Sequence, residues 1–382
     1  MGERIRVCWY CEKWQPGGIQ AVQVNLLQHM DLNRIHVDVV VSEDDTSLFD
    51  GKLQALGVKK LVTLDKRYDS PARRILANIV AFGKIIKQNK YDVVHLNICH
   101  GVELVYCFLA WLYRVPVRIV HCRNNDIGAG GRSRKIKILC HNIGKRFFRN
   151  CATIKLANSD LAASWLYTKG DLKKYRVEII RNGIDARRYA FDPEIREKLR
   201  HELHIENQFV VGHVGHFNYQ KNHEFLLSVF REILSAESEA VLLLVGAGER
   251  QKQIETLAQE YGIADHVIFY GVTNDVPAVM MAMDVFVFPS RFEGFGNVLV
   301  EAQACGLKCF ASDSVIPKAV QITENVTWIS LDEPCRLWAE KILSAGADHK
   351  RKSYVDSVIT AGYDISNMAE AMEKMYLTGK YR

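Results

Sequence analysis

The sequence predicts an α/β protein made of two doubly wound parallel domains that face each other across a cleft. Strand-like apolar runs alternate with helix-like amphipathic stretches from one end of the chain to the other, which is typical of parallel sheets covered by helices. The 382 residues provide enough chain for two domains of ordinary size. A polar stretch near the middle, from Asn182 to Asp185, is expected to form the hinge between them.

The first half contains short runs of β-branched and apolar residues that we expect to be strands. Stretches with helical spacing separate these runs, among them residues 18–30 and 71–90. Together they form the first predicted domain, residues 1–182. The expected strands are Ile5–Tyr10, His36–Ser42, Lys60–Leu64, Val93–Leu96, Val117–His121, Thr153–Asn158 and Val177–Ile180.

A second series of strands follows the hinge and builds the second predicted domain, residues 183–362. Ligands bind beyond the carboxyl ends of the strands in such sheets, so we expect the functional site in the cleft. The expected strands of this half are Phe209–Val214, Ala240–Val245, Val267–Tyr270, Val285–Phe288 and Lys308–Ala311.

The composition is that of a soluble globular protein, with 48% hydrophobic and 25% charged residues. No apolar run approaches the roughly 18 residues that span a bilayer, and the N-terminus lacks the apolar core of a signal peptide. We therefore expect a cytoplasmic protein. The pair Cys8 and Cys11 lies on and just after the first strand and has no second pair to complete a zinc site, so the ten cysteines are expected to be free thiols.

The net charge of +6 is mild, but basic residues are concentrated between Arg132 and Arg149. Apolar residues recur there at three- and four-residue intervals, which predicts a basic amphipathic helix that suits an anionic membrane surface. An ordinary outer helix with a solvated charged face has the same pattern, and both interpretations stay open. No aromatic-interleaved basic motif is present, so nucleic acid is not an expected partner. The basic residues are Arg132, Arg134, Lys135, Lys137, Lys145, Arg146 and Arg149.

The most informative segment of the chain runs from Pro289 to Gly306. It follows a buried strand, and its second half has helical spacing that ends at a glycine. Glu293 is thus expected in a strand-to-helix loop, and Glu301 about one turn inside the helix. The intervening amides lie at a helix N-terminus, which favours a phosphate; they belong to Phe295, Gly296, Asn297 and Val298. Two hydroxyl-binding acids beside a phosphate suit a sugar nucleotide.

Three other features are weaker candidates. Gly17 and Gly18 open the first helix, where glycines allow a backbone to approach a diphosphate, although such a turn is often only structural. Lys221 begins the helix after the first strand of the second domain and would meet a pyrophosphate as a point charge, or be merely solvated. His121 ends a strand at the expected cleft edge, where it either binds substrate or bonds to backbone.

Two further patterns limit the chemistry. Gly246 and Gly248 resemble part of a dinucleotide fingerprint, but position 251 is glutamine, so a tight strand-to-helix turn is the expected role. The chain contains no Asp-x-Asp pair of the kind that commonly holds a nucleotide-sugar diphosphate through a divalent metal. We therefore expect no metal cofactor, with the helix N-terminus and Lys221 neutralising the charge instead.

Together these residues resemble the family-4 retaining glycosyltransferases of GT-B fold, whose two domains are Rossmann-like. The likeness spans nearly the whole chain, and its specific part is Glu293-x7-Glu301 within Pro-Ser-x-x-Glu-Gly-Phe-Gly. The sequences of three segments are similar to those of bacterial enzymes of capsular and exopolysaccharide assembly; the segments are residues 220–223, 301–306 and 328–333. The supporting elements are Gly17-Gly18, Asp92-Val-Val-His95, His121, Asn182-Gly-Ile-Asp185, Val214-Gly215 through Lys221, and Gly246-x-Gly248.

The resemblance implies a role for each matching position. Glu293 would contact donor-sugar hydroxyls, Glu301 the ribose hydroxyls, and His121 would lie beside the reacting sugar. The diphosphate would meet the amides of residues 295–298 and of Gly18, aided by Lys221. The loop from Val272 to Asn274 would bracket the base. It also implies that a C-terminal helix within 363–382, about Ser366–Thr378, crosses back onto the first domain.

One position departs from the family pattern. The family usually has arginine after the glycine that Gly215 matches, whereas this chain has His216. Histidine offers fewer donors and is mostly neutral near pH 7. The resemblance thus implies weaker or pH-dependent donor binding at this position.

The implied activity is retaining transfer of a hexose or N-acetylhexosamine from a UDP-sugar to a glycan or polyprenyl-linked acceptor, at the inner face of the cell membrane if the basic helix binds there. Glucose, galactose and their N-acetyl forms are all compatible donors. Two alternatives stay open. One is a UDP-N-acetylglucosamine 2-epimerase, which shares the two-domain architecture, and the other is a non-catalytic nucleotide-sugar-binding partner in an assembly complex.

Overall fold

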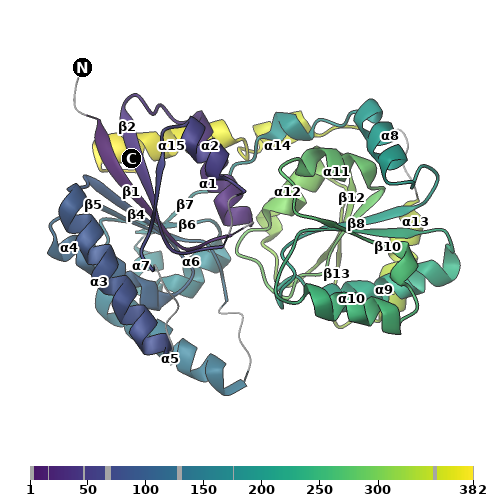
Figure 1. The fold of residues 1–382 in the computed structure, drawn as a ribbon, viewed down its shortest axis with the longest axis horizontal. Coiled ribbons are helices and arrows are strands. Elements are labelled where there is room, and N and C mark those ends of the chain that lie inside the picture. Colours follow the sequence, from purple (N-terminus) through teal and green to yellow (C-terminus); the bar gives the residue numbers. More distant parts are fainter. Residues whose placement is uncertain are drawn as a thin grey trace. The chain divides into compact units, whose positions relative to one another are not determined.

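The computed structural model of the chain divides into two compact units, each with its own parallel sheet (Figure 1). The first unit contains residues 1–15, 19–183 and 365–382, and the second contains residues 16–18 and 184–364. The structure describes residues 4–15, 17–45, 48–64, 70–126, 131–174, 176–346 and 351–381. The expected boundaries lay at 182/183 and 362/363, one or two residues from these.

The sheet of the first unit has the strand order β3-β2-β1-β4-β5-β6-β7, with every described pair parallel. Chain order reverses between β1 and β4, so this is a doubly wound sheet. Its strands are β1 (Ile5–Trp14), β2 (Ile35–Asp44), β3 (Lys59–Val62), β4 (Val93–Ile98), β5 (Val117–Cys122), β6 (Ile154–Ala157) and β7 (Glu178–Ile179). Its helices of at least five residues are α1 (Gly18–His29), α2 (Asp50–Ala55), α3 (Pro71–Asn89), α4 (Leu104–Leu112), α5 (Gly131–Phe148), α6 (Asp160–Leu166), α7 (Lys169–Lys173) and α15 (Ile365–Thr378).

Strand β1 is longer than the sequence predicts. It continues to Trp14, whereas the expected strand ended at Tyr10. The reason is its neighbour: β2 extends equally far, and Trp14 pairs in register with Asp44. Trp14 is fully buried, so the strand extension places a large apolar side chain in the core.

Each face of this sheet buries a separate core. Residues Val7, Trp9 and Cys11 of β1 point to one face, which packs against α1 and α15. Cys8 and Tyr10 point to the other, which packs against α3, α4 and α6. Because strand side chains alternate, the near-continuous apolar runs of β1 and β4 are those of strands buried on both sides. The last helix, α15, therefore completes the first unit although it follows the second in sequence (Figure 1).

The sheet of the second unit has the order β10-β9-β8-β11-β12-β13, again parallel in every described pair. Sequence reasoning missed β13, a four-residue edge strand too short for a clear pattern. Its strands are β8 (Val210–Val214), β9 (Val241–Val245), β10 (Val267–Gly271), β11 (Val285–Phe288), β12 (Lys308–Ser312) and β13 (Val326–Ile329). Its helices of at least six residues are α8 (Pro193–Glu202), α9 (His223–Ala236), α10 (Gln251–Glu260), α11 (Val276–Ala282), α12 (Asn297–Ala304), α13 (Cys335–Ala345) and α14 (Val355–Thr360).

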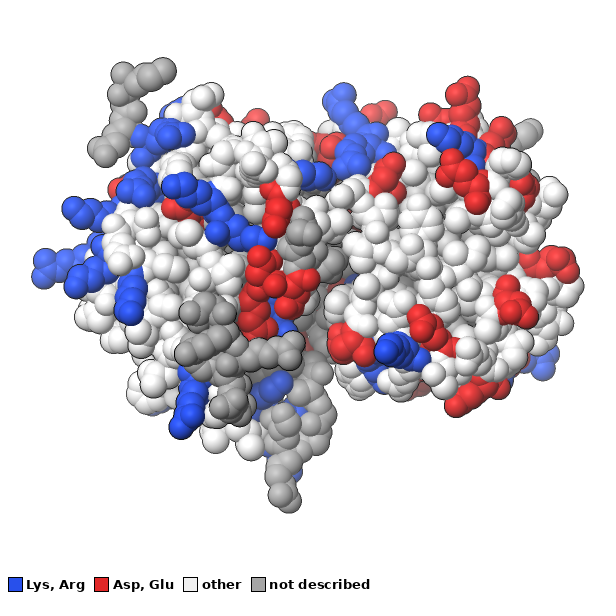
Figure 2. Space-filling model, in the orientation of Figure 1, with Lys and Arg blue, Asp and Glu red and all other residues white. Residues whose placement is uncertain are grey.

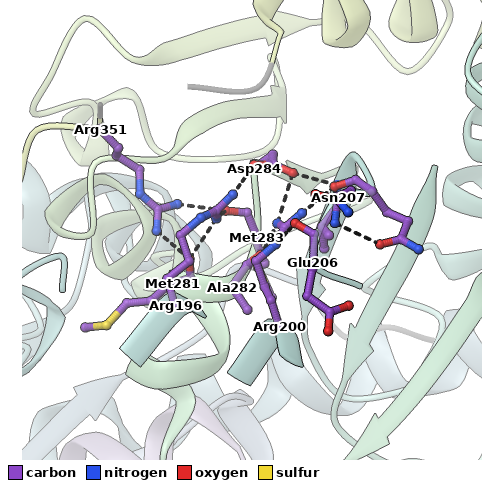
Figure 3. Close-up of polar contacts among 11 residues, drawn as sticks. Arg196, Arg200, Glu206, Asn207, Met281, Ala282, Met283, Asp284 and Arg351 are labelled. Carbon is purple, nitrogen blue, oxygen red and sulfur yellow. Dashed lines mark hydrogen bonds and ion pairs between the residues drawn. The ribbon is translucent and has the colours of Figure 1, made fainter. Parts of the chain in front are cut away.

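A buried ionic network ties the amino-terminal end of this sheet to its helices (Figure 3). Asp284, directly before β11, lies 2.5 Å from Arg196 and 3.2 Å from Arg200, both on α8. Its carboxylate also accepts the amide of Val210 at 2.8 Å, which fixes the start of β8. Arg196 and Arg351 donate to the carbonyls of Met281 and Met283 at the end of α11, where cations complement the helix dipole. The network is structural, because it lies at the opposite end of the strands from a ligand site.

The two units differ sharply in charge. The first holds 33 Lys and Arg against 18 Asp and Glu, whereas the second holds 17 against 26. On the face shown in Figure 2, Lys and Arg are prominent on the first unit and Asp and Glu on the second. Among the described residues, no helix combines the length and hydrophobicity needed to cross a bilayer.

Candidate nucleotide-sugar site

The candidate site lies in the second unit, where the order of the strands reverses. Strands β8 and β11 are neighbours in the sheet but are separated by β9 and β10 in the chain. The connections that follow these two strands therefore run in opposite directions along the sheet. A crevice forms between them at the carboxyl ends of the strands, which is the usual ligand position in doubly wound sheets. The loop after β8 carries Lys221, and the loop after β11 carries Glu293.

Lys221 and Glu293 form a buried ion pair at this crevice. The Lys221 Nζ lies 2.7 Å from Glu293 Oε1, and their side chains are 15% and 7% exposed. Ser290 donates its hydroxyl to the same oxygen at 2.8 Å, and the ammonium lies 4.5 Å from the centre of the Phe288 ring. The structure thus joins two residues 72 positions apart that the sequence nominated separately.

Backbone and side-chain bonds hold the two loops against each other. Asn222, in the left-handed conformation at φ 58°, donates its side-chain amide to the carbonyl of Pro289 at 3.1 Å. The amide of Arg291 donates to the carbonyl of Gln220 at 2.8 Å, and its guanidinium donates to the carbonyl of Tyr219 at 2.9 Å. The Lys221–Glu293 geometry is therefore set by three bonds outside the pair itself.

Gly246 and Gly248 lie in the loop after β9, and the close packing of this loop accounts for both glycines. A Cβ on Gly246 would lie 2.2 Å from the carbonyl oxygen of Gly215, and one on Gly248 would lie 2.5 Å from that of Phe217. Gly246 also has φ 137°, which favours glycine. The two glycines permit the amides of Gly215 and Phe217 to donate to carbonyls of the β9 loop at 2.9 Å. Their role is close approach of two loops beside Lys221.

Helix α12 presents its N-terminus at the same edge. Gly296 precedes it at φ 93°, a left-handed conformation that only glycine adopts readily, and the helix begins at Asn297. The structure therefore places the amides near Phe295, Gly296, Asn297 and Val298 at the start of a helix, as the sequence predicts. Helix N-termini attract phosphate through free N–H groups and the helix dipole.

Glu301 lies one turn further along α12 in a largely buried setting. Burial raises the pKa of its carboxyl to about 7, although the Tyr189 hydroxyl, Lys221 and Arg188 each act in the opposite direction. Part of this side chain remains open to solvent. A largely buried carboxyl beside the Lys221–Glu293 ion pair and Arg188 fits a group that binds hydroxyls.

Arg188 and Tyr189 are residues that sequence reasoning missed. They lie in the 3-10 turn Ala186–Tyr189, close after the predicted hinge. Arg188 lies 3.9 Å from Asp275, and it donates to the carbonyl of Asn274 at 3.5 Å. It thereby links the loop of Val272 and Asn274, expected to bracket a base, to the neighbourhood of Glu301. Val272 is 39% exposed. The signal that could have found Arg188 is the Arg187-Arg188 pair beside the hinge.

His216, the residue in place of the family's arginine, already has an acidic partner. Its Nε2 lies 3.2 Å from Glu249 Oε2, on the loop after β9, and its side chain is 22% exposed. An imidazole held by a carboxylate has one ring nitrogen left for a phosphate, whereas a guanidinium has five N–H donors. The weaker or pH-dependent donor binding that the resemblance implies at this position stays a prediction.

In the first unit, His121 differs from the expectation of a position at the cleft edge, outside the core. It lies on β5 and is fully buried, because the strand continues to Cys122 and helices cover that face. Its Nε2 has no hydrogen-bond partner among the described residues. Gly17 precedes α1 and Gly18 begins it, at the carboxyl end of β1.

Chemically, the second unit offers one cation, two carboxyls and a helix N-terminus at one edge of the sheet. This set suits a diphosphate, whose charge meets Lys221 and the α12 amides, next to hydroxyls that meet Glu293 and Glu301. The described residues contain no cluster of three or more His, Cys, Asp or Glu placed to hold a metal ion.

Two doubly wound domains with such a site at the switch point of the second define the GT-B class of glycosyltransferases. Two family models match the chain: Glycosyltransferase Family 4 over residues 16–188, and Glycosyl transferases group 1 over residues 194–361. The chain therefore belongs to the glycosyltransferases that combine these two domains, and it is a transferase. The matched stretches lie on the first and second unit, respectively.

Relatives extend the match over most of the chain. EpsF of Bacillus subtilis (strain 168), which is named as a glycosyltransferase, is 28% identical over 365 residues, covering 94% of this chain and 93% of EpsF. The UDP-Gal:alpha-D-GlcNAc-diphosphoundecaprenol alpha-1,3-galactosyltransferase of Escherichia coli is 25% identical over 312 residues, covering 78% and 76%. The structure of Anabaena Alr3699/HepE in complex with UDP-glucose matches with a TM-score of 0.77, covering 99% of this chain and 100% of HepE; at 20% identity this likeness shows the fold alone.

Proposed function

We propose that this protein transfers a hexose or N-acetylhexosamine from a UDP-sugar, with retention, to a glycan or lipid-linked acceptor in cell-surface polysaccharide biosynthesis. The observation that carries the proposal is the buried Lys221–Glu293 pair at the switch point, 2.7 Å between charged atoms. The pair lies at the carboxyl ends of β8 and β11, where doubly wound sheets bind ligands. A ligand with both a charged and a hydroxyl-bearing part suits this position.

A uridine nucleotide is supported by one relative. The Escherichia coli enzyme uses UDP-Gal by name and acts on a diphosphoundecaprenol-linked sugar. An acceptor of the same lipid-linked class is therefore our choice for this chain.

The proposed mechanism is displacement on the front face of the donor sugar. The bond from the anomeric carbon to the diphosphate oxygen breaks, the acceptor oxygen attacks from the same side, and its proton passes to the departing diphosphate. Lys221 and the α12 amides stabilise the negative charge that develops on that oxygen. Glu293 positions the sugar through its hydroxyls. We propose that these fixed charges serve in place of a metal ion.

The test is kinetic, with Lys221→Met and Glu293→Gln as variants. The reaction is followed as UDP release from UDP-glucose, UDP-galactose and their N-acetyl forms, with a GlcNAc-diphospho-lipid acceptor and with EDTA present. We expect each variant to fold and to lose activity at least about 100-fold, as when a charge-stabilising group is removed. Activity near that of the unaltered chain in either variant would contradict the proposal.

The matched control is Lys155→Met. Lys155 forms an equally short and buried pair with Asp171 in the first unit, 2.6 Å apart, with side chains 9% and 5% exposed. Its loss should lower stability about as much as Lys221→Met while turnover is retained. Incubation of UDP-N-acetylglucosamine without acceptor completes the test, because formation of its 2-epimer would identify an epimerase instead.

We further propose that helix α5 holds the enzyme on an anionic membrane. One side of this helix is packed: a Cβ on Gly144 would lie 1.9 Å from the Gly101 carbonyl oxygen, and His141 Nδ1 accepts the Gly101 amide at 2.9 Å. Apolar side chains on its remaining surface are unusually exposed: Ile136 60%, Leu139 61%, Ile143 46% and Phe147 68%.

The charge around the exposed surface of α5 also supports membrane binding. Lys135, Lys137 and Arg146 are exposed on α5, within a unit that has an excess of basic residues, while the side chain of Arg132 lies outside the described part. Exposed apolar side chains flanked by cations fit the interface of an anionic bilayer. A lipid-linked acceptor would be presented there.

A further inference from the structure

Glu224, in the first turn of α9, binds side chains from two other segments of the second unit. Its Oε1 accepts from Nη2 of Arg250, which lies on the loop after β9, and its Oε2 lies 3.3 Å from Nη2 of Arg291, on the loop after β11. Gln253 on α10 adds a bond from its side-chain amide to Oε1 at 3.2 Å. One carboxylate therefore joins the chain segments that follow β8, β9 and β11.

The three joined segments carry much of the candidate site. Strand β8 lies between β9 and β11 in the sheet, so the carboxyl ends of the three strands are neighbours. Glu224 follows Lys221 by three residues, and Arg291 precedes Glu293 by two. A carboxylate that bonds to Arg291 thus connects the segment that carries the cation to the segment that carries the acid.

Arg291 contacts the segment after β8 on both sides of the lysine. Its amide donates to the carbonyl of Gln220 at 2.8 Å and its guanidinium to that of Tyr219 at 2.9 Å. The guanidinium carbon also lies 4.3 Å from the centre of the Tyr219 ring, which is a cation–π distance. Tyr219 and Gln220 precede Lys221 and Glu224 follows it, so Arg291 holds the backbone before and after the lysine.

This network acts on local geometry more than on overall stability. The side chains of Glu224, Arg250 and Arg291 are 25%, 24% and 28% exposed, and ion pairs this close to solvent contribute little to the free energy of unfolding. An acid in the first turn of a helix also complements the helix dipole, but the dipole does not account for arginines that reach it from two other loops. Because a guanidinium bonds through a rigid planar fork, the network fixes how the loops lie against each other.

Resting on the proposed function, we infer that Glu224 is a positioning residue for the transfer. Through Arg250 and Arg291 it holds the loops after β9 and β11 against the start of α9, so that Lys221 and Glu293 keep the 2.7 Å contact from which each acts on the donor. Because a misplacement of about 1 Å can reduce a rate about 100-fold, a group outside the reacting atoms can control kcat in this way.

The first test measures the loops without substrate, by amide hydrogen exchange of the full chain. The amides of Lys221 and Arg291 both bond to the loop after β8. In Glu224→Ala they should exchange about threefold faster or more, the size of one lost surface ion pair, because the joined segments open more often. Glu255→Ala is the matched control, since Glu255 is a half-buried acid of the same unit that accepts from Gln251 within its own helix at 2.9 Å. It should leave both amides unchanged.

The second test is kinetic and follows UDP release, as for the proposed function. Glu224→Ala should lower kcat about tenfold, while its melting temperature stays within about 4 °C of that of the unaltered chain. Glu224→Gln keeps an oxygen that accepts from one guanidinium, so it should recover part of kcat, and Glu255→Ala should keep all of it. Combined with Arg250→Met, Glu224→Ala should lose less than the product of the two single losses, because both changes remove the same bond.

Three results would overturn the inference. They are unchanged exchange at Lys221 and Arg291 in Glu224→Ala, an unchanged kcat in that variant, and a loss of kcat that only follows a loss of folded protein. If the unaltered chain transferred no sugar, the proposed function would fail while the exchange result would stand, so the two failures are distinguishable.

Discussion

At the scale of single residues, the sequence named charged groups that the structure brings close together, but it did not show their environment. Glu293, Lys221 and Glu301 were nominated from spacing, yet their burial and mutual contacts depend on segments far apart in the chain. Arg188 was missed because the Arg187-Arg188 pair beside the hinge does not by itself show what it contacts. His121 was expected at the cleft edge, outside the core, whereas packing buries it completely.

The raised pKa of Glu301 makes a prediction about stability. A carboxyl whose pKa rises from an ordinary value near 4.5 to about 7 on folding stabilises the protein below pH 4.5, and this contribution is lost as the pH rises through 7. Relative to the unaltered chain, Glu301→Gln should therefore gain stability between pH 4.5 and 8, by no more than about 3 kcal/mol because the side chain is partly solvated.

Thermal unfolding over that pH range checks this, with Glu340→Gln on the exposed surface of α13 as control. The control should follow the unaltered chain at every pH. A Glu301→Gln profile parallel to that of the unaltered chain would show that the carboxyl is not perturbed.

At the scale of elements, long periodic segments were predictable and short edge strands were not. The limits of β11 were predicted to the residue, while β13 was missed and β1 proved four residues longer because β2 pairs with it. Strand length is decided by the neighbouring strand, which a local pattern does not show.

Replacing a helical glycine by alanine should have opposite effects on stability at two positions, Gly144 on α5 and Gly83 on α3. A Cβ on Gly144 would collide with the Gly101 carbonyl oxygen at 1.9 Å, whereas one on Gly83 of α3 would make ordinary contacts with the side chains of Tyr113 at 3.5 Å and Leu109 at 4.0 Å. Gly144→Ala should destabilise the protein by about 2 kcal/mol or more. Gly83→Ala should stabilise it by about 0.5–1 kcal/mol, because alanine is the better helix former. Melting temperatures that move in the same direction for both would contradict this packing.

The exposed surface of α5 gives a prediction about membranes. Leu139→Ser combined with Phe147→Ser should weaken binding to vesicles of phosphatidylglycerol and phosphatidylethanolamine at least about tenfold, since each side chain would contribute roughly 1.5–3 kcal/mol when buried in lipid. Sedimentation with vesicles measures this. Ile195→Ser, at an apolar position of α8 that is 39% exposed in the second unit, is the control and should bind as the unaltered chain does. Unchanged binding of the double variant would show that α5 does not contact the membrane.

At the scale of the whole molecule, the two units differ in how they depend on the rest of the chain. Residues 184–364 are continuous and contain Lys221, Glu293 and Glu301 together with their own cores. Expressed alone, this segment should fold and bind UDP with an affinity within about threefold of the full chain, as measured by calorimetry. Loss of UDP binding in the folded segment would mean that essential contacts lie elsewhere.

The first unit should not fold from residues 1–183 alone. Residues 1–183 lack α15, whose Met368, Met372 and Met375 are almost fully buried in the first unit's core. Truncation would expose this apolar surface and remove Tyr376, whose hydroxyl accepts the Trp9 indole N–H, so we expect residues 1–183 alone to be unfolded by circular dichroism. Joining them to residues 365–382 through a flexible linker should restore the fold.

By itself, the sequence determined the class of fold, nearly every strand, and the residue types that can meet a sugar nucleotide, because hydrophobic periodicity and glycine positions are local properties of the chain. Only the tertiary structure decided that Lys221 pairs with Glu293, that Glu249 holds His216, and that Tyr376 reaches His95 from the last helix. These contacts join segments from 33 to 281 residues apart. They depend on the strand order of a doubly wound sheet, which brings the ends of distant strands together and which no local pattern records.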